Sequence, residues 1–204
     1  MCLTMAARNE AHACSVIAFS ILITWRLSGA DYVTPSSEEY DYDIRKFLNT
    51  SETIWTLNTT SEKLQMCKSD LKQNMNETEI FFRRKHQGSE GELLQGQFLL
   101  NKLFHEYDSM DVGKPGALSD REEIIFRGYN NTCAIFKTTL LANVIIYFSY
   151  NQREIIYELR VTDSSVDNPD KECFEEFDYV ARSRKTHVPY ASWCRRLMRK
   201  PMHA

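Results

Sequence analysis

Apolar and polar residues alternate in short runs along much of the chain, with turn-forming residues between the runs. The clearest pair is Val144–Tyr150 and Ile155–Val161, which are rich in β-branched and aromatic residues and flank a polar turn. This pattern predicts a β-hairpin. In its second strand, the period of two places Glu158 and Arg160 on one face and Leu159 on the other.

Further strands are predicted by the same kind of pattern at Ile54–Leu57, Leu64–Cys67, Glu79–Lys85, Glu123–Arg127 and Cys133–Leu140. His86–Gly91 and Asp108–Asp120 contain turn-forming residues and are expected to be loops. The run Gln97–Tyr107 fits the periods of both a strand and a helix. Many short strands separated by turn signals predict an all-β sandwich or barrel.

Two helices are predicted outside the strands. The run Glu38–Leu48 carries apolar residues at helical spacing, which indicates a short helix before the first strand. A second helix is expected near the C-terminus, with Asn168 as its cap and Pro169 in its first position. Cys173 and Phe177 lie on the apolar stripe of this second helix.

The N-terminus is typical of a secretory signal peptide. Arg8 precedes the apolar run Ala13–Trp25, and small residues follow at Ser28–Ala30. The run is too short to span a bilayer comfortably, so a retained anchor is the less favoured alternative. We therefore predict cleavage after Ala30, a secreted extracellular protein and no membrane span. The predicted organisation is a signal peptide at 1–30, one domain at 31–194 and a basic tail at 195–204.

Four cysteines remain after the signal peptide, namely Cys67, Cys133, Cys173 and Cys194. An even number in a secreted chain predicts two disulfides, for which three pairings are possible. Four glycosylation sequons begin at Asn49, Asn58, Asn76 and Asn130. Both features indicate an extracellular glycoprotein.

Composition and motifs argue against other classes of protein. The formal net charge of −3 does not suggest a nucleic-acid-binding protein. No Gly-x-Ser-x-Gly, phosphate-loop or His-Glu-x-x-His motif is present, and the histidines lack metal-ligand spacing. We expect no enzymatic activity, no cofactor and no metal. With 43% hydrophobic residues, the chain can form a sizeable core for one domain.

The order of several short motifs resembles the tick salivary lipocalins, the group that includes the histamine-binding proteins. The motifs are IWTLNTT after a helix, Cys67-Lys-Ser-Asp, Cys133 in a late strand, Tyr157-Glu-Leu, Cys173 opening a helix and Cys194 near the end. The resemblance implies an eight-stranded antiparallel barrel with a short N-terminal helix and a C-terminal helix packed outside. It also implies the pairs Cys67–Cys194 and Cys133–Cys173.

The chain departs from the amine-binding members of that group. Those proteins resemble one another in an Asp after the late-strand Cys and an aromatic residue after Glu-Leu, whereas this chain has Ala134 and Arg160. Near the N-terminus it has Asp43-Ile-Arg45 where they place Asp-Ala-Trp. A buried amine needs carboxylates and aromatic faces around it, so these departures disfavour histamine or serotonin.

We therefore expect a carrier of a small apolar or amphipathic host mediator, such as a fatty acid, eicosanoid or sterol, that modulates host inflammation or immunity. The alternatives are a biogenic-amine scavenger and a module that binds a host immune protein or cell surface through its loops. The expected ligand-binding residues are Glu158, Arg160, Arg45, Asp43, Tyr147 and Phe136. A ligand carboxylate would pair with Arg160 first and Arg45 second.

Several alternatives stay open for these residues. Glu158 can contact the ligand or simply pair with Arg160. A one-residue change of register would turn Arg160 to solvent. Phe136 and Tyr147 fit the core as well as a pocket. The basic tail fits a solvated terminus or a contact with an anionic surface.

Overall fold

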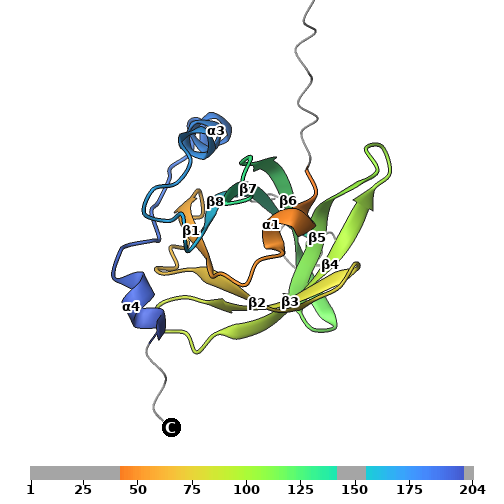
Figure 1. Ribbon diagram of the computed structural model, residues 1–204, viewed down its shortest axis with the longest axis horizontal. Coiled ribbons are helices and arrows are strands. Elements are labelled where there is room, and N and C mark those ends of the chain that lie inside the picture. Colours follow the sequence, from red (N-terminus) through yellow and green to blue (C-terminus); the bar gives the residue numbers. More distant parts are fainter. Residues whose placement is uncertain (1–41, 142–154, 200–204) are drawn as a thin grey trace, which may run out of the picture. The chain divides into compact units, whose positions relative to one another are not determined.

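The computed structural model describes residues 42–141 and 155–199, and its central feature is a closed barrel of eight strands in sequential order (Figure 1). Every neighbouring pair is antiparallel, and β1 pairs with β8 to close the barrel. The strands are β1 Ile54–Thr59, β2 Ser69–Met75, β3 Glu79–Lys85, β4 Glu92–Asn101, β5 Glu106–Lys114, β6 Ala117–Arg127, β7 Cys133–Leu140 and β8 Ile156–Thr162. The predicted all-β barrel class is confirmed.

One end of the barrel is covered by the helix α1, Ile44–Leu48 (Figure 1). The helix begins later than the predicted Glu38, because Asp43 has an extended backbone and caps it by accepting a hydrogen bond from the Arg45 N–H. Phe47 is buried and packs on Phe136 of β7, with ring centroids 5.7 Å apart. The barrel interior next to α1 is consequently filled with side chains.

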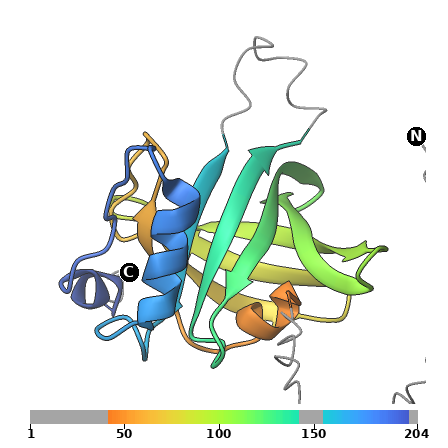
Figure 2. The ribbon, with the colours of Figure 1, turned by 90° about the horizontal axis from the view of Figure 1, so that it is seen from above.

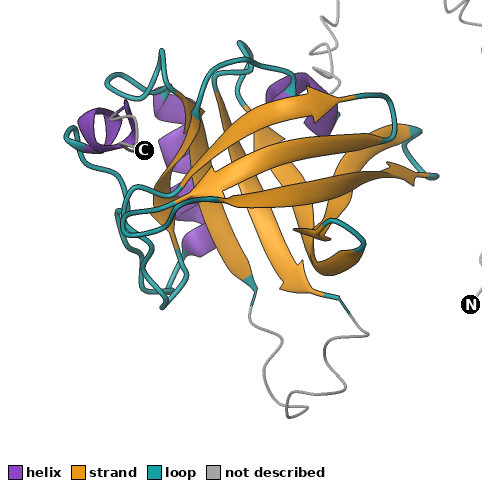
Figure 3. Cartoon of the chain, turned by 90° about the horizontal axis from the view of Figure 1, so that it is seen from below, coloured by secondary structure: helices purple, strands orange, loops and turns teal. Residues whose placement is uncertain are grey.

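Two further helices lie outside the barrel (Figures 2 and 3). The helix α3, Lys171–Ala181, packs against β8, and α4 spans Cys194–Arg199. The cap of α3 is Asp170, whose side chain accepts from the Glu172 N–H, so the predicted cap at Asn168 is wrong. The Asn168 N–H instead donates to the Ser165 carbonyl in the preceding turn.

The alternation of side chains divides the core into two layers. The inner layer fills the barrel around Phe98, Met110 and Phe136. The outer layer lies between the barrel and α3, where Leu159 and Val161 join the apolar stripe of the helix. The predicted facing of β8 is therefore correct, with Leu159 outside and Glu158 and Arg160 buried inside.

Three other local predictions were wrong. Leu64–Cys67 lies in the β1–β2 connection, and β2 begins at Ser69. Asp108–Asp120 is largely strand, because β5 and β6 are joined by a turn of only two residues, 115–116. The run Gln97–Tyr107 is neither one strand nor one helix, since it contains the turn between β4 and β5. The predicted strand Val144–Tyr150 lies outside the described residues, and the described partners of β8 are β1 and β7.

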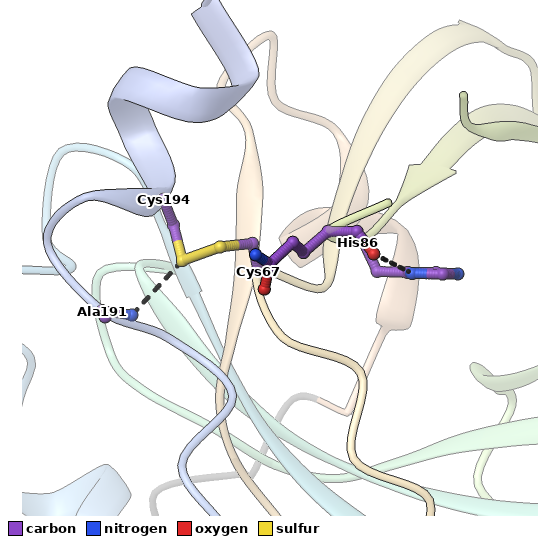
Figure 4. Close-up of a disulfide and its surroundings, with 5 residues drawn as sticks. Cys67, His86, Ala191 and Cys194 are labelled. Carbon is purple, nitrogen blue, oxygen red and sulfur yellow. Dashed lines mark hydrogen bonds between the residues drawn. A yellow bond between two sulfur atoms is a disulfide. The ribbon is translucent and has the colours of Figure 1, made fainter. Parts of the chain in front are cut away.

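Both disulfides implied by the resemblance are formed. Cys133–Cys173 joins β7 to α3, and Cys67–Cys194 joins the β1–β2 connection to α4 (Figure 4). The Cys67 N–H also donates to the Pro189 carbonyl. The backbone beside Lys68 is thus held from outside the barrel.

Candidate functional site

A cavity of about 470 Å³ opens at the end of the barrel away from α1. Leu140 and Ile156 belong to its wall. They are the terminal residues of β7 and β8 at the ends that lie farthest from α1 in Figure 2. Most of the lining is polar or charged. The lining residues are Thr56, Thr59, Ser61, Lys63, Gln65, Lys68, Arg84, Asp120, Glu122, Thr138, Leu140, Ile156, Glu158 and Pro189.

A cluster of charged side chains separates this cavity from the apolar interior next to α1. It comprises three cations and three carboxylates that alternate in space, namely Lys68, Arg84, Arg160, Asp70, Glu122 and Glu158. The residues come from β2, β3, β6 and β8 and from the position just before β2. We call this set the charge cluster.

Arg160 is the centre of the charge cluster. Its Nη1 lies 2.6 Å from Glu122 Oε2, and its Nη2 lies 2.7 Å from Glu158 Oε2. The guanidinium also lies over the ring of Phe136, 4.2 Å from the centroid. With 1% of its side chain exposed, Arg160 is enclosed and does not line the cavity.

Arg84 connects the remaining carboxylate, Asp70, to Glu122. It binds Asp70 through two parallel hydrogen bonds of 2.7 Å, and its Nη2 also donates to Glu122 Oε1 at 3.0 Å. This paired geometry is the strong form of an arginine–carboxylate contact. Asp70 and Arg84 lie opposite each other on the paired strands β2 and β3. Because Glu122 is on β6, the Arg84–Glu122 contact crosses the barrel interior.

Lys68 completes the charge cluster from the cavity side. Its Nζ lies 2.5 Å from Glu158 Oε1. The Lys68 carbonyl accepts from the Thr56 N–H, and the preceding residue forms the Cys67–Cys194 disulfide. The ammonium is therefore presented by a firmly held backbone.

The pKa values follow from burial and from this pairing. Burial alone would raise the pKa of Glu158, but Lys68 and Arg160 lower it to about 2. The pKa of Glu122 is also lowered well below its ordinary value, because Arg160 and Arg84 outweigh its burial. Burial lowers the pKa of Lys68, and the Glu158 carboxylate opposes that change.

Some cation N–H groups stay unused on the cavity side of the charge cluster. Each oxygen of the three carboxylates already accepts from a cation. Lys68 uses one of its three N–H groups, and Arg84 makes no hydrogen bond through Nη1 among the described residues. The wall formed by Lys68 and Arg84 is thus suited to accept an anionic or acceptor-rich ligand group.

The structure brings together only some of the predicted ligand-binding residues. Glu158 lines the cavity, whereas Arg160 and Phe136 lie beneath it. Arg45 pairs with Asp43 at 2.7 Å at the start of α1 and stacks over Tyr107. Neither Arg45 nor Asp43 lines the cavity. Tyr147 lies outside the described residues.

Four members of the charge cluster were missed at the level of sequence, namely Lys68, Asp70, Arg84 and Glu122. The sequence contains a signal for two of them. Lys68 and Asp70 are charged residues at alternating positions directly after Cys67, which was predicted to form a disulfide. Arg84 lies near the end of the predicted strand Glu79–Lys85. Their meeting depends on the order and register of the strands, which alternation alone does not supply.

The structure also shows where the predicted glycosylation sites and the start of the predicted basic tail lie. Asn49, Asn76 and Asn130 are exposed, and Asn58 is half-buried on β1. The predicted basic tail begins within α4, where Arg195 Nε lies 2.7 Å from Asp163. No group of three metal-ligating side chains occurs among the described residues, and no helix there is long and apolar enough to cross a membrane.

Comparison with known proteins supports the fold. The sequence matches no protein-family model, and a search of curated proteins gives no match. The AM182–serotonin complex has a TM-score of 0.51 with 17% identity, covering 73% of this chain and 90% of that one. The fold is a lipocalin-type barrel.

Japanin from Rhipicephalus appendiculatus, bound to cholesterol, is 13% identical over 71% of this chain and 96% of its own, with a TM-score of 0.44. The siderocalin Ex-FABP, whose ligand specificity is dual, is 9% identical over 68% and 87%, with a TM-score of 0.45. At these identities the likeness concerns the arrangement of the strands. The ligand of this lipocalin-type barrel has to be inferred from its own cavity.

Proposed function

We propose that this protein is a secreted carrier that binds a small amphipathic ligand through an anionic head group, with a fatty acid or an eicosanoid as the class that fits best. By sequestering such a host mediator, the protein would block its signal. In this way the protein would modulate inflammation or immunity. The observation that carries the proposal is the donor-rich wall of Lys68 and Arg84 inside a cavity of about 470 Å³. Cavities of this size suit small molecules.

The cavity also suggests an orientation for the ligand. Its deep wall is charged, whereas its apolar lining residues Leu140 and Ile156 lie at the strand ends that form the mouth. A ligand carboxylate would enter first and bind Lys68 and Arg84, and the alkyl chain would lie toward the mouth. Each buried methylene would contribute about 0.8 kcal/mol.

An anionic head group narrows the ligand class that was expected from the sequence, because it excludes sterols. A sterol has no anionic group to use the free donors, and most of the cavity lining is polar. The preferred carboxylate partner also changes from Arg160 to Lys68 and Arg84, because Arg160 is enclosed by Glu122, Glu158 and Phe136. The two disulfides support an extracellular location.

The alternative of an amine scavenger meets an obstacle in the charge cluster. The AM182 structure is a serotonin complex. In this chain, however, the lining carboxylates of the charge cluster, Glu122 and Glu158, are already bound by its cations. The other lining carboxylate, Asp120, lies opposite Leu140 near the mouth. The alternative of a protein-binding module has lost one of its two expected loops, since Asp108–Asp120 is mostly strand.

Calorimetric titration of the unmodified protein tests the proposal. Palmitate is expected to bind at least about tenfold more tightly than its methyl ester, since the ester has the same chain but no anion for the free donors. Serotonin and cholesterol are titrated in the same way, as representatives of the competing amine and sterol classes. Equal affinity for acid and ester would contradict the assigned head group, and tight serotonin binding without palmitate binding would restore the amine alternative.

A further inference from the structure

The Lys68 ammonium occupies the position in which a ligand amine would meet the barrel's carboxylates. It lies 2.5 Å from Glu158 Oε1, inside the cavity that a ligand would enter. An ammonium ligand bound to Glu158 would need the same contact. We propose that Lys68 is the specificity-determining residue of this cavity, a tethered cation that excludes amines and admits anions.

The backbone around Lys68 fits the role of a tether. Cys67 has a positive φ of 58° and is held by its disulfide to Cys194 (Figure 4). Its N–H also donates a hydrogen bond to the Pro189 carbonyl. On the other side, the Lys68 carbonyl accepts from Thr56 of β1. Because these contacts hold the main chain on both sides of Lys68, its ammonium can bind Glu158 without the ordering of a loose segment.

Charge balance explains why this cation selects the ligand. The three carboxylates and three cations of the charge cluster neutralise one another. A ligand amine would add a fourth cation to a buried set that has no unpaired carboxylate oxygen, which is costly in a low-dielectric site. A ligand carboxylate would instead receive the unused N–H groups of Lys68 and Arg84.

Removing the Lys68 charge should reverse the preference. In Lys68→Met, Glu158 Oε1 loses its ammonium partner and a negative charge is left unmatched at the cavity wall. An amine ligand can then supply the missing cation, and a carboxylate ligand meets repulsion in place of attraction. This inference deepens the proposed function, because it assigns the ligand class of the same cavity to one residue.

The test is a calorimetric titration of the full secreted protein with serotonin and with palmitate. Lys68→Met is expected to bind serotonin at least roughly tenfold more tightly than the unmodified protein and palmitate at least roughly tenfold more weakly. Lys72→Met is the matched control. It removes the same charge from β2, the strand that directly follows Lys68, but the Lys72 ammonium binds the neutral Asn49 side chain, so no carboxylate is released. Lys72→Met should therefore gain no affinity for serotonin.

Two further variants keep the test decisive. If Lys68→Met does not fold, Lys68→Gln replaces it, since its amide keeps an N–H donor near Glu158 while the charge is still lost. The double variant Lys68→Met with Glu158→Gln should lose the gain in serotonin affinity. Unchanged serotonin affinity in both folded Lys68 variants, or an equal gain in Lys72→Met, would overturn the assignment.

The outcome for this inference is separable from that of the proposed function. If the unmodified protein fails to bind palmitate but Lys68→Met gains serotonin binding, the proposed function falls and Lys68 remains the residue that excludes amines. If the unmodified protein binds palmitate and Lys68→Met gains nothing for serotonin, the carrier function stands and the role of Lys68 is refuted.

Discussion

Arg160 of β8 and Glu122 of β6 meet inside the barrel with 2.6 Å between Nη1 and Oε2, although β7 lies between their two strands. Both side chains are 1% exposed. The contact therefore spans the barrel interior and supports the floor of the cavity. Several measurable properties follow from this buried pair and its neighbours.

Arg160→Met should strongly destabilise the protein. The substitution leaves Glu122 and Glu158 without their shared cation, and removing one partner of a buried pair typically costs about 3–5 kcal/mol. Urea unfolding would measure the change in the free energy of unfolding. Arg121→Met is the control, because Arg121 pairs with Asp111 near the surface and its loss should cost about 1 kcal/mol or less. Equal losses for the two variants would contradict the central role of Arg160.

The charge cluster should make the free energy of unfolding decrease at acid pH. The pKa of Glu158 is about 2 in the folded protein, below its ordinary value of 4.5, so its pairing stabilises the fold above pH 4.5. That stability, about 3 kcal/mol for a group shifted this far, is lost as the pH falls toward 2. Glu158→Gln should be less stable at pH 7 and should show a shallower loss below pH 5 by urea unfolding.

Glu123→Gln is the control for this acid dependence. Glu123 is the neighbour of Glu122 but pairs with Lys137 in a partly exposed position. Its replacement should shift the stability curve little and leave its slope in acid close to that of the unmodified protein. A Glu158→Gln curve parallel to the unmodified one would show that the Glu158 pairing does not stabilise the fold.

Binding of an acidic ligand should weaken at alkaline pH. Burial lowers the pKa of Lys68 below its ordinary 10.5, so the ammonium loses its proton at a lower pH than an exposed lysine would. Palmitate stays ionised throughout this range. Its affinity should therefore fall with rising pH before pH 10.5 is reached, and Lys68→Met should lack this decline. Lys72→Met should retain it.

The two disulfides should differ in their effect on ligand binding. In the chain-entropy model, the separations of 127 and 40 residues give about 5 kcal/mol for Cys67–Cys194 and about 4 kcal/mol for Cys133–Cys173. Replacing either pair by serine should lower the midpoint of thermal unfolding. Only loss of Cys67–Cys194 should also weaken palmitate binding, because Cys67 holds Lys68. Equal weakening of palmitate binding by both double variants would show that the Cys67–Cys194 disulfide has no special role in positioning Lys68.

Glycosylation should follow the exposure of the sequons. Asn130 lies in the exposed turn between β6 and β7, and Asn58 is half-buried on β1. We expect Asn130 to carry a glycan, detected as a site-specific mass shift after treatment of the secreted protein with peptide N-glycosidase. Asn130→Gln should abolish that signal without changing stability. An unmodified Asn130 in protein secreted from a glycosylating cell would refute this prediction.

Local patterns in the sequence were sufficient for much of the barrel. Alternation located β3 at Glu79–Lys85 without error and placed Glu158 on the inner face of β8, because a strand exposes successive side chains to opposite sides. Turn signals were less reliable. Residues 115–116 form the tight turn of the β5–β6 hairpin, and these residues together with Gly113 led to the prediction of a long loop.

The composition of the charge cluster was decided by tertiary structure. Asp70, Arg84, Glu122 and Arg160 are far apart in sequence, and they meet because closure of the barrel sets which strands face one another and in which register. A single sequence determines which residues point inward, since that depends only on neighbours along one strand. Which inward charges pair, and therefore which donors remain for a ligand, depends on distances across the barrel that no local pattern contains.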